Sequence, residues 1–221
     1  MSNYLLWLTF VITFFDWLAT AKEWKGMRYL TKPGVMLVLL AWLGVSVGIK
    51  GYPMWFGMGL VFSMIGDVLL MLPDRFFIAG AGAFVFAHLS YIIGFNQQLP
   101  PINLASLVIV SVVVVSAWVN YHQLSSSMKN IAGKLLILVR VYTIVISVML
   151  LSATLDLVRP GWATGPALLT LIGAALFFTS DTFLAWDRFV KPLPYRGLLV
   201  MITYHLGQIA LIAGVVQNTI S

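Results

Sequence analysis

Cysteine is absent from the 221-residue sequence, and charged side chains are scarce. Without a thiol the chain has no disulfide framework and no cysteine nucleophile. Charged residues make up 9% of the chain, whereas a soluble domain usually has about 25%. Hydrophobic residues make up 61%. This composition excludes a sizeable soluble domain and predicts a protein that lies almost wholly within a membrane.

The net charge of +6 reflects 13 lysines and arginines against 7 aspartates and glutamates. In a chain this apolar, an excess of basic residues is typical of loops on the cytoplasmic side of a bilayer. We therefore expect membrane lipid as a partner, and no nucleic acid. The first apolar stretch, Tyr4 to Ala21, has no basic residue before it, which is typical of a retained helix rather than a cleaved signal peptide.

Eight apolar runs are long enough to cross about 30 Å of hydrocarbon. Breakers such as Lys32-Pro33-Gly34 and Gly51-Tyr52-Pro53 separate them, and Lys32 is expected to extend the short second run by snorkelling. The sequence predicts an all-α integral membrane protein with eight transmembrane helices in one polytopic domain, residues 1–221. The runs are Tyr4–Thr20, Gly34–Ile49, Met54–Leu72, Phe76–Gln97, Asn103–Tyr121, Lys134–Leu157, Ala163–Trp186 and Tyr195–Val216.

Basic residues gather in alternate connections between these runs. The even-numbered connections hold only Lys50 and Arg159, and Asp156 near Arg159 is interpreted as a snorkelling pair at the outer surface. This asymmetry places both termini on the non-cytoplasmic side of the membrane, which we expect to be a bacterial inner (plasma) membrane. The basic residues of the odd-numbered connections are Lys22, Lys25, Arg28, Lys32, Arg75, Lys129, Lys134, Arg188, Lys191 and Arg196.

The stretch from Phe62 to Phe95 has a weaker echo near the C-terminus. In each copy an aspartate ends one helix and a histidine lies midway along the next, Asp67 with His88 and Asp181 with His205. Four helices separate the copies, which predicts a four-plus-four parallel repeat with halves of approximately 1–100 and 101–221. The two aspartates would then face each other, roughly 7–8 Å inside the cytoplasmic boundary.

Ionisable groups inside apolar helices indicate a functional site. Helical spacing places Tyr91 beside His88 and Gln208 beside His205. With the aspartates they predict a polar pocket that opens toward the cytoplasm and is floored by the histidines. Two carboxyl groups in such a place cannot both ionise easily, so one neutral and one ionised group would form an acid–base pair.

Several motifs, spread from the second helix to the last, match one family. The pattern G-A-F-x-x-x-H-x-x-Y begins at Gly82, and the other matches are Lys32-Pro33, Gly66-Asp67, Ser180-Asp181-x-x-Leu184-Ala185, and Thr203-Tyr204 followed by Gln208. In these positions the sequence resembles the YhhN/TMEM86 family of integral membrane proteins. The resemblance implies lysoplasmalogenase activity, in which the vinyl ether bond of a lysophospholipid is hydrolysed to a fatty aldehyde and glycerophosphoethanolamine or glycerophosphocholine.

We expect Asp67 and Asp181 to be the catalytic pair for such a reaction. A neutral carboxyl group would protonate the vinyl ether, and an ionised one would stabilise the resulting oxocarbenium ion. No metal and no cofactor is expected. The residues expected to orient groups in the site are His88, Tyr91, Tyr204 and Gln208, and those expected to hold the substrate's phosphate are Arg140 or Lys32.

Three other functions remain open on the sequence alone. A lipid or small-molecule transporter would also use a parallel repeat and a central polar binding site. A non-catalytic sensor or assembly partner would use the polar residues only to join helices. A metal-dependent hydrolase would need ligands from His88, His205 and the two aspartates, although the sequence has no H-x-x-x-H or H-E-x-x-H motif.

Overall fold

A computed structural model describes residues 3–127 and 133–220, so Lys129 lies outside the described residues. Within these two stretches there are eight long helices, two short 3-10 helices (Asp74–Phe76 and Leu155–Leu157) and no strand. All eight are long and apolar enough to cross a membrane, which confirms the predicted all-α membrane fold. They are α1 (Asn3–Ala21), α2 (Lys25–Val47), α3 (Tyr52–Met71), α4 (Phe77–Phe95), α5 (Leu104–Ser127), α6 (Lys134–Thr154), α7 (Thr164–Phe189) and α8 (Arg196–Ile220).

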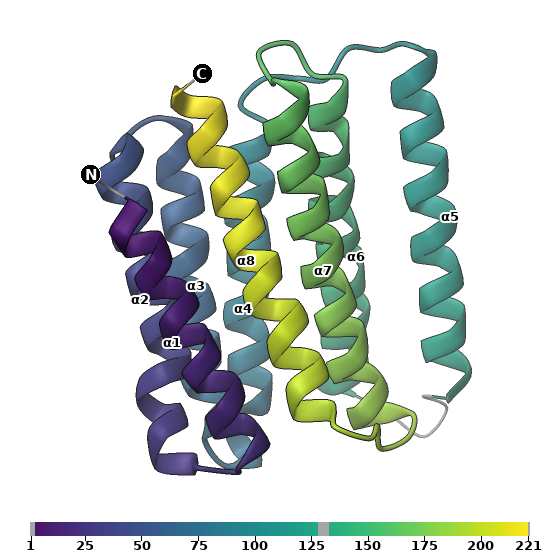
Figure 1. Cartoon of the computed structure of the whole chain (residues 1–221). Helices are drawn as coiled ribbons and strands as arrows, with labels where there is room; N and C mark the ends of the chain where they lie inside the picture. The colour runs from purple at the N-terminus through teal and green to yellow at the C-terminus, as the bar shows by residue number, and fades with distance from the viewer. Residues whose placement is uncertain (1–2, 128–132, 221) are drawn as a thin grey trace.

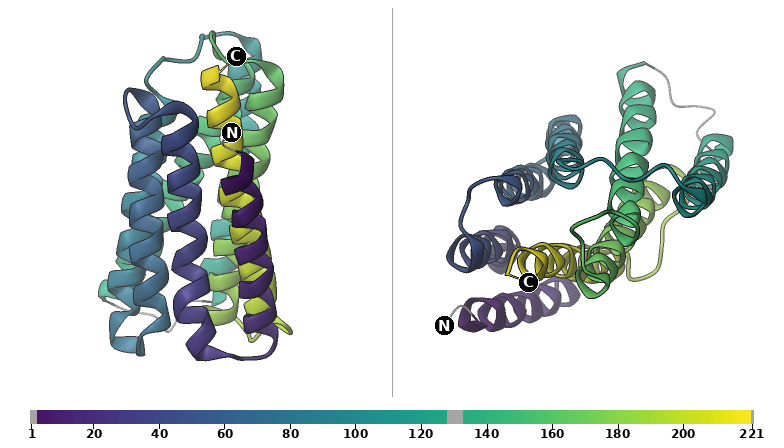
Figure 2. Two further views of the ribbon diagram at one scale, coloured as in Figure 1. Left: turned by 60° about the vertical axis from the view of Figure 1, so that its left-hand side comes forward. Right: turned by 90° about the horizontal axis from the view of Figure 1, so that it is seen from above.

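The helices run side by side along one direction, and the two ends of the chain lie toward the same end of the bundle (Figure 1). Helices α3 and α4 pack closely as one neighbouring pair, and α7 and α8 as another. Seen along the bundle, α8 lies between α1 and α2 on one side and α7 on the other, while α5 stands at the edge (Figure 2). The most buried surface therefore lies along α8.

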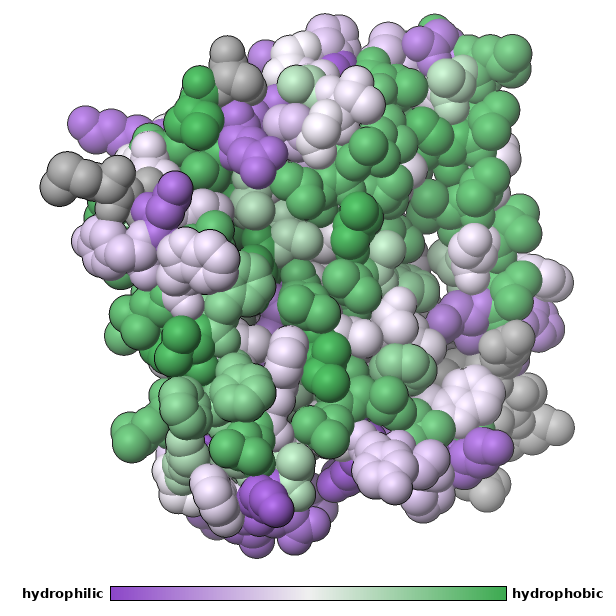
Figure 3. Space-filling view, viewed as in Figure 1, coloured by the Kyte–Doolittle hydropathy of each residue, from purple (hydrophilic) through white to green (hydrophobic). Residues whose placement is uncertain are grey.

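Hydrophobic side chains cover the middle of the face shown in Figure 3, and hydrophilic ones gather at its two ends. This is the pattern of a bundle whose outer surface contacts lipid along its middle. One end carries the connections α1–α2, α3–α4 and α7–α8, with the basic residues Lys22, Arg75 and Lys191. We call it the basic end.

The second helix begins much earlier than the sequence predicts. Helix α2 starts at Lys25 and has Pro33 in its interior, so Lys32-Pro33-Gly34 is not a connection. A proline inside a membrane helix is tolerated because neighbouring helices can satisfy the backbone groups that it frees. The prediction that Lys32 snorkels outward is also wrong, because its side chain is 5% exposed and points into the bundle, where it meets an aspartate.

Glycines allow α3 and α4 to approach each other closely. A Cβ atom added to Gly59 would lie 2.1 Å from the ring of Tyr91, and one added to Gly66 would lie 2.6 Å from the ring of Phe84. No side chain larger than hydrogen fits at either position. These contacts set the depth of Asp67, which follows Gly66 directly, relative to the side chains of α4.

Candidate active site

Asp67 is fully enclosed between three helices. Its Oδ1 lies 3.1 Å from the Nζ of Lys32 on α2, and both side chains are almost completely buried. Its Oδ2 accepts a hydrogen bond of 2.8 Å from the hydroxyl of Tyr204 on α8. A lysine ammonium at this distance favours the ionised carboxylate. Asp67 is therefore a buried anion that is held by one cation and one neutral donor.

Asp181 has a different environment. The hydroxyl of Tyr142 on α6 donates a 2.6 Å hydrogen bond to its Oδ2. The Nε2 atom of His88 on α4 lies 3.2 Å from the same oxygen. Asp181 keeps 12% of its side chain exposed, whereas His88 is fully buried. One carboxyl oxygen is thus occupied by partners from two helices, and the side chain still reaches open space.

A third chain of hydrogen bonds links α4, α8 and α3. The hydroxyl of Tyr91 donates to Oε1 of Gln208 at 2.8 Å, and Nε2 of Gln208 donates to the Ser63 hydroxyl at 2.9 Å. All three side chains are buried. Tyr91 and Gln208 were expected to orient groups in the site, and here they bond to each other and to Ser63. Their contacts are those of groups that fix the helices around the site.

A cavity that we call the polar vestibule contains both aspartates. Its empty volume is about 1070 Å³, and it is lined by residues of α2, α3, α4, α7 and α8 near the basic end. Its charged lining residues are, besides Asp67 and Asp181, the cations Arg28, Lys32, Arg188 and Arg196 and the anions Asp74 and Asp187. Three of these cations are paired, Lys32 with Asp67, Arg188 with Asp74 and Arg196 with Asp187.

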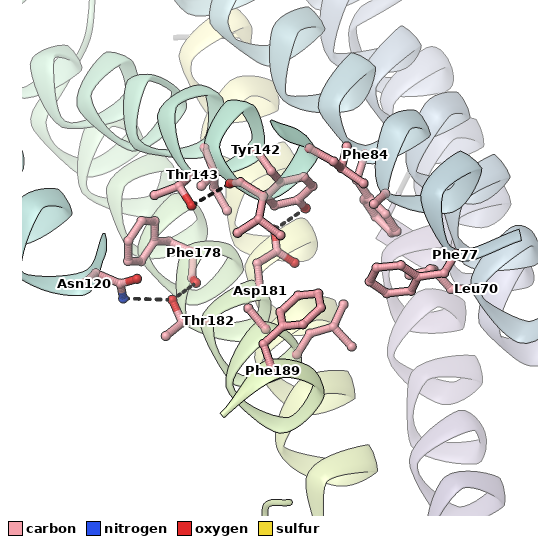
Figure 4. Close-up of a pocket in the computed structure, with 16 residues that line it drawn as sticks. Leu70, Phe77, Phe84, Asn120, Tyr142, Thr143, Phe178, Asp181, Thr182 and Phe189 are labelled. Atoms are coloured by element: carbon pink, nitrogen blue, oxygen red, sulfur yellow. Dashed lines mark hydrogen bonds between the residues drawn. The ribbon is translucent and has the colours of Figure 1, made fainter. Parts of the chain in front are cut away.

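A second cavity, which we call the apolar groove, adjoins the polar vestibule. It has an empty volume of about 700 Å³, and its walls come mainly from α4, α6 and α7. Figure 4 shows Phe178 and Phe189 in its wall, and Asn120 of α5 bonded to Thr182 of α7 at one side. The residues that line both cavities are Leu70, Phe77, Phe84, Asp181 and Leu184.

The two cavities together suit an amphiphilic molecule. A charged head group would lie in the polar vestibule, and one apolar chain would lie in the apolar groove. The bond that joins head and chain would then lie beside Asp181, the one titratable residue in the lining of both cavities.

Four of the residues predicted for the site line the polar vestibule, namely Asp67, Asp181, Lys32 and Tyr204, whereas His88, Tyr91, Gln208, Arg140 and His205 line neither cavity. Arg140 lies on an exposed face of α6 and lines neither cavity, whereas Arg28 lines the polar vestibule. His205 is buried on α8, lines neither cavity, and has no hydrogen-bond partner among the described residues. Sequence reasoning missed Tyr142, because a single tyrosine in an apolar run has no motif around it.

A buried ion pair lies at the opposite end of the bundle. Asp156 and Arg159 are in direct contact with both side chains 0% exposed, so the expectation of a snorkelling surface pair is wrong. Arg159 also donates to Oδ1 of Asn96 at 3.0 Å, and Asp156 accepts from Thr170. These bonds join α4, the segment after α6, and α7. The pair can be buried because two residues distant in the sequence supply further hydrogen bonds, Asn96 to Arg159 and Thr170 to Asp156.

Metal-binding side chains do not cluster anywhere in the described part of the molecule. Across residues 3–127 and 133–220, no group of three His, Asp or Glu side chains is arranged to hold a metal ion. The two histidines of the predicted repeat lie in different surroundings, since His88 contacts Asp181 and His205 does not contact either aspartate through a hydrogen bond.

Comparisons with known proteins agree with the resemblance found in the sequence. Residues 27–215 match the YhhN family. A protein of Mus musculus named lysoplasmalogenase TMEM86B is 32% identical over 197 residues, which cover 89% of this chain and 77% of the relative. Its Sus scrofa counterpart is 30% identical with the same coverage. The uncharacterized membrane protein YhhN of Escherichia coli O6:H1 is 28% identical, over 80% of this chain and 83% of the relative. No solved structure matches the chain.

Proposed function

The chain belongs to the YhhN family, and from that premise we propose that it is a membrane-embedded lysoplasmalogenase. The reaction hydrolyses the vinyl ether bond of a lysoplasmalogen to a fatty aldehyde and glycerophosphoethanolamine or glycerophosphocholine. One observation carries the proposal: a charged cavity and an apolar cavity meet at Asp181, and Asp67 lines the charged one. A lipid with one chain has its head group and chain joined at such a point.

The cavities suggest how the substrate binds. Arg28 and Lys32 line the polar vestibule, and we assign the phosphate of the head group to them. The exposed position of Arg140 makes it a poor candidate for this role. The alkenyl chain lies in the apolar groove between α4, α6 and α7, where burial of each CH₂ contributes about 0.8 kcal/mol. A lipid with one chain fits this arrangement.

Catalysis uses the two aspartates as an acid–base pair. A neutral carboxyl group protonates the carbon β to the ether oxygen, and the positive charge that develops on the adjacent carbon and oxygen is stabilised by the ionised carboxylate. Water then adds, and the hemiacetal collapses to aldehyde and alcohol. His88 and Tyr204 orient Asp181 and Asp67 through the hydrogen bonds that they share with them. No metal or cofactor takes part.

The internal repeat and the orientation also belong to this proposal. Each aspartate is bonded by one residue from the second helix of its own half and one from the fourth helix of the other half. Asp67 meets Lys32 of α2 and Tyr204 of α8. Asp181 meets Tyr142 of α6 and His88 of α4. This exchange supports a single membrane domain of two parallel halves, with the polar vestibule opening at the basic end.

We further propose that the basic end faces the cytoplasm, in a bacterial inner membrane, since basic loops are retained on that side. Tagging would test this directly. A cytoplasm-only reporter is expected to be active in the α3–α4 connection and inactive at the C-terminus. The reverse pattern would place the polar vestibule on the other side of the membrane.

Aldehyde release by the purified protein tests the activity. We expect aldehyde from a lysoplasmalogen and none from the matching ester lysolipid, and in D₂O we expect one deuterium on the carbon next to the aldehyde. Asp67→Asn should abolish the reaction while the variant still purifies as a folded protein. Glu23→Gln, at an exposed position outside both cavities, is the matched control and should keep full activity. An intact lipid after incubation with folded wild-type protein would point to transport.

A further inference from the structure

The two aspartates differ in which charged groups they contact. Asp67 pairs with Lys32 at 3.1 Å. Over the described ranges, no lysine or arginine forms an ion pair with Asp181, whose partners are the neutral hydroxyl of Tyr142 and the ring of His88. An ammonium at this distance favours an ionised carboxylate. Asp67 is therefore the aspartate that has a cation to balance a negative charge, and Asp181 is the one bonded by a hydroxyl and an imidazole.

The hydrogen bonds on Asp181 also indicate which of its oxygens would carry a proton. Tyr142 donates to Oδ2 at 2.6 Å, and Nε2 of His88 lies 3.2 Å from the same atom. The Nδ1 atom of His88 has no partner among the described residues, which is consistent with a proton on Nε2 that is donated to Asp181. When Asp181 carries a proton, that proton belongs on Oδ1, because Oδ2 is the oxygen that faces both donors.

We propose that Tyr142 is a positioning residue that holds Asp181 with its proton on Oδ1, facing the junction of the two cavities, so that Asp181 is the proton donor and Asp67 is the ionised partner. This role rests on the proposed lysoplasmalogenase activity. Figure 4 shows the Tyr142 ring and Asp181 side by side at the wall of the apolar groove. The ring of Tyr142 also packs edge-on against that of His88, with centroids 5.5 Å apart, which fixes both donors.

The proton transfer balances with this assignment. The Oδ1–H bond of Asp181 breaks, and its proton forms a C–H bond with the β carbon by using the π electrons of the double bond. The adjacent carbon and the ether oxygen share the positive charge, opposite the carboxylate of Asp67. The oxygen of a water molecule bonds to that carbon and returns a proton to the Asp181 carboxylate. The bond between the hemiacetal carbon and the glycerol oxygen then breaks, and the proton of the hemiacetal hydroxyl moves to that oxygen. The products are the aldehyde and the alcohol.

Other titratable and charged groups face Asp181, and they set the background for any pH measurement. The nearest contacts are His88 of α4 and Tyr142 of α6. Among the described side chains of α5, the uncharged Asn120 lines the apolar groove. Across the polar vestibule lie Arg28 and Lys32 of α2, Asp67 of α3, Asp74 of the short helix before α4, Asp187 and Arg188 of α7, and Arg196 and Tyr204 of α8.

Tyr142→Phe is the first test, because phenylalanine keeps the ring and removes only the hydroxyl. We expect kcat to fall by about 10- to 100-fold with little change in KM. A hydrogen bond to a carboxyl group is stronger when that group is ionised, so its loss should move the high-pH limb of the rate profile to higher pH. Tyr52→Phe, which removes a bonded hydroxyl far from both cavities, is the matched control and should change neither quantity.

The two aspartate variants provide a second test that does not depend on Tyr142. In Asp181→Asn the residual rate should rise about tenfold for each unit by which the pH falls, because hydronium replaces the missing acid. In Asp67→Asn any residual rate should keep the pH dependence of the wild type. The reverse pattern, or an unmoved profile in Tyr142→Phe, would overturn the assignment although the wild type releases aldehyde. Absence of aldehyde from the wild type would instead refute the proposed function itself.

Discussion

Replacement of Lys32 by methionine should destabilise the protein, because it leaves the buried carboxylate of Asp67 without its cation. The Nζ atom lies 3.1 Å from Oδ1, and at an effective dielectric constant of about 20 this corresponds to an attraction of about 5 kcal/mol. Without Lys32 the buried carboxylate must stay unpaired or take up a proton. Protonation of an ordinary carboxyl group at pH 7 costs about 4 kcal/mol, which limits the loss. We therefore expect the free energy of unfolding to fall by about 3–4 kcal/mol, within the range observed for broken buried ion pairs.

Two further variants show whether the loss comes from the unpaired charge. In Lys32→Met with Asp67→Asn, both charges are gone and the amide oxygen still accepts the bond from Tyr204, so most of the lost stability should return. Lys50→Met removes an exposed lysine and is the matched control. The measurement is denaturant unfolding in detergent micelles, followed by circular dichroism or tryptophan fluorescence.

The pH dependence gives an independent check. Protonation of a carboxyl group costs about 2.7 kcal/mol less at pH 5 than at pH 7. The stability that Lys32→Met loses should therefore be smaller at pH 5 by a similar amount. A loss below about 1 kcal/mol at pH 7, or a double variant that is less stable than Lys32→Met, would refute a buried charge on Asp67.

Three further predictions concern binding and packing. Arg28→Ala should raise KM at least several-fold with a smaller change in kcat, whereas Arg140→Ala should leave both within about twofold, as measured by aldehyde release. Gly173→Ala would place a Cβ atom 2.4 Å from a backbone nitrogen of α8 and should lower the free energy of unfolding by about 1–3 kcal/mol or more. Gly165→Ala on the same helix meets nothing within 4 Å and is the control, and thermal unfolding compares the two variants. Arg159→Met should cost about 3–5 kcal/mol of stability and leave the kcat of the folded fraction unchanged.

Much of the fold follows from the sequence, because the bilayer leaves few alternatives. A run of about 20 apolar residues can satisfy its backbone in lipid only as a helix or as part of a closed barrel, so length and composition alone define eight helices. Helix ends are less certain. Pro33 looks like a breaker in a soluble context, but α2 continues through it and brings Lys32 to the interior.

The site is predictable only in part. Asp67, Asp181 and His88 stand out because ionisable groups are costly in a membrane helix, and all three take part in the polar contacts around the cavities. Tyr142 and Arg159 do not stand out, because their roles depend on partners from other helices. Arg140 was expected to hold the phosphate, but the sequence does not show that its side chain lies on an exposed side of α6.

The proposed reaction is the hydrolysis of a vinyl ether at the site that contains Asp67 and Asp181. The most direct measurement is aldehyde release by the purified protein from a lysoplasmalogen and from the matching ester lysolipid, with and without a chelator, beside Asp67→Asn and Asp181→Asn. We predict that aldehyde forms only from the vinyl ether, that the chelator does not change its release, and that both variants release none. Folded wild-type protein that leaves the vinyl ether intact, or full activity in either variant, would contradict it.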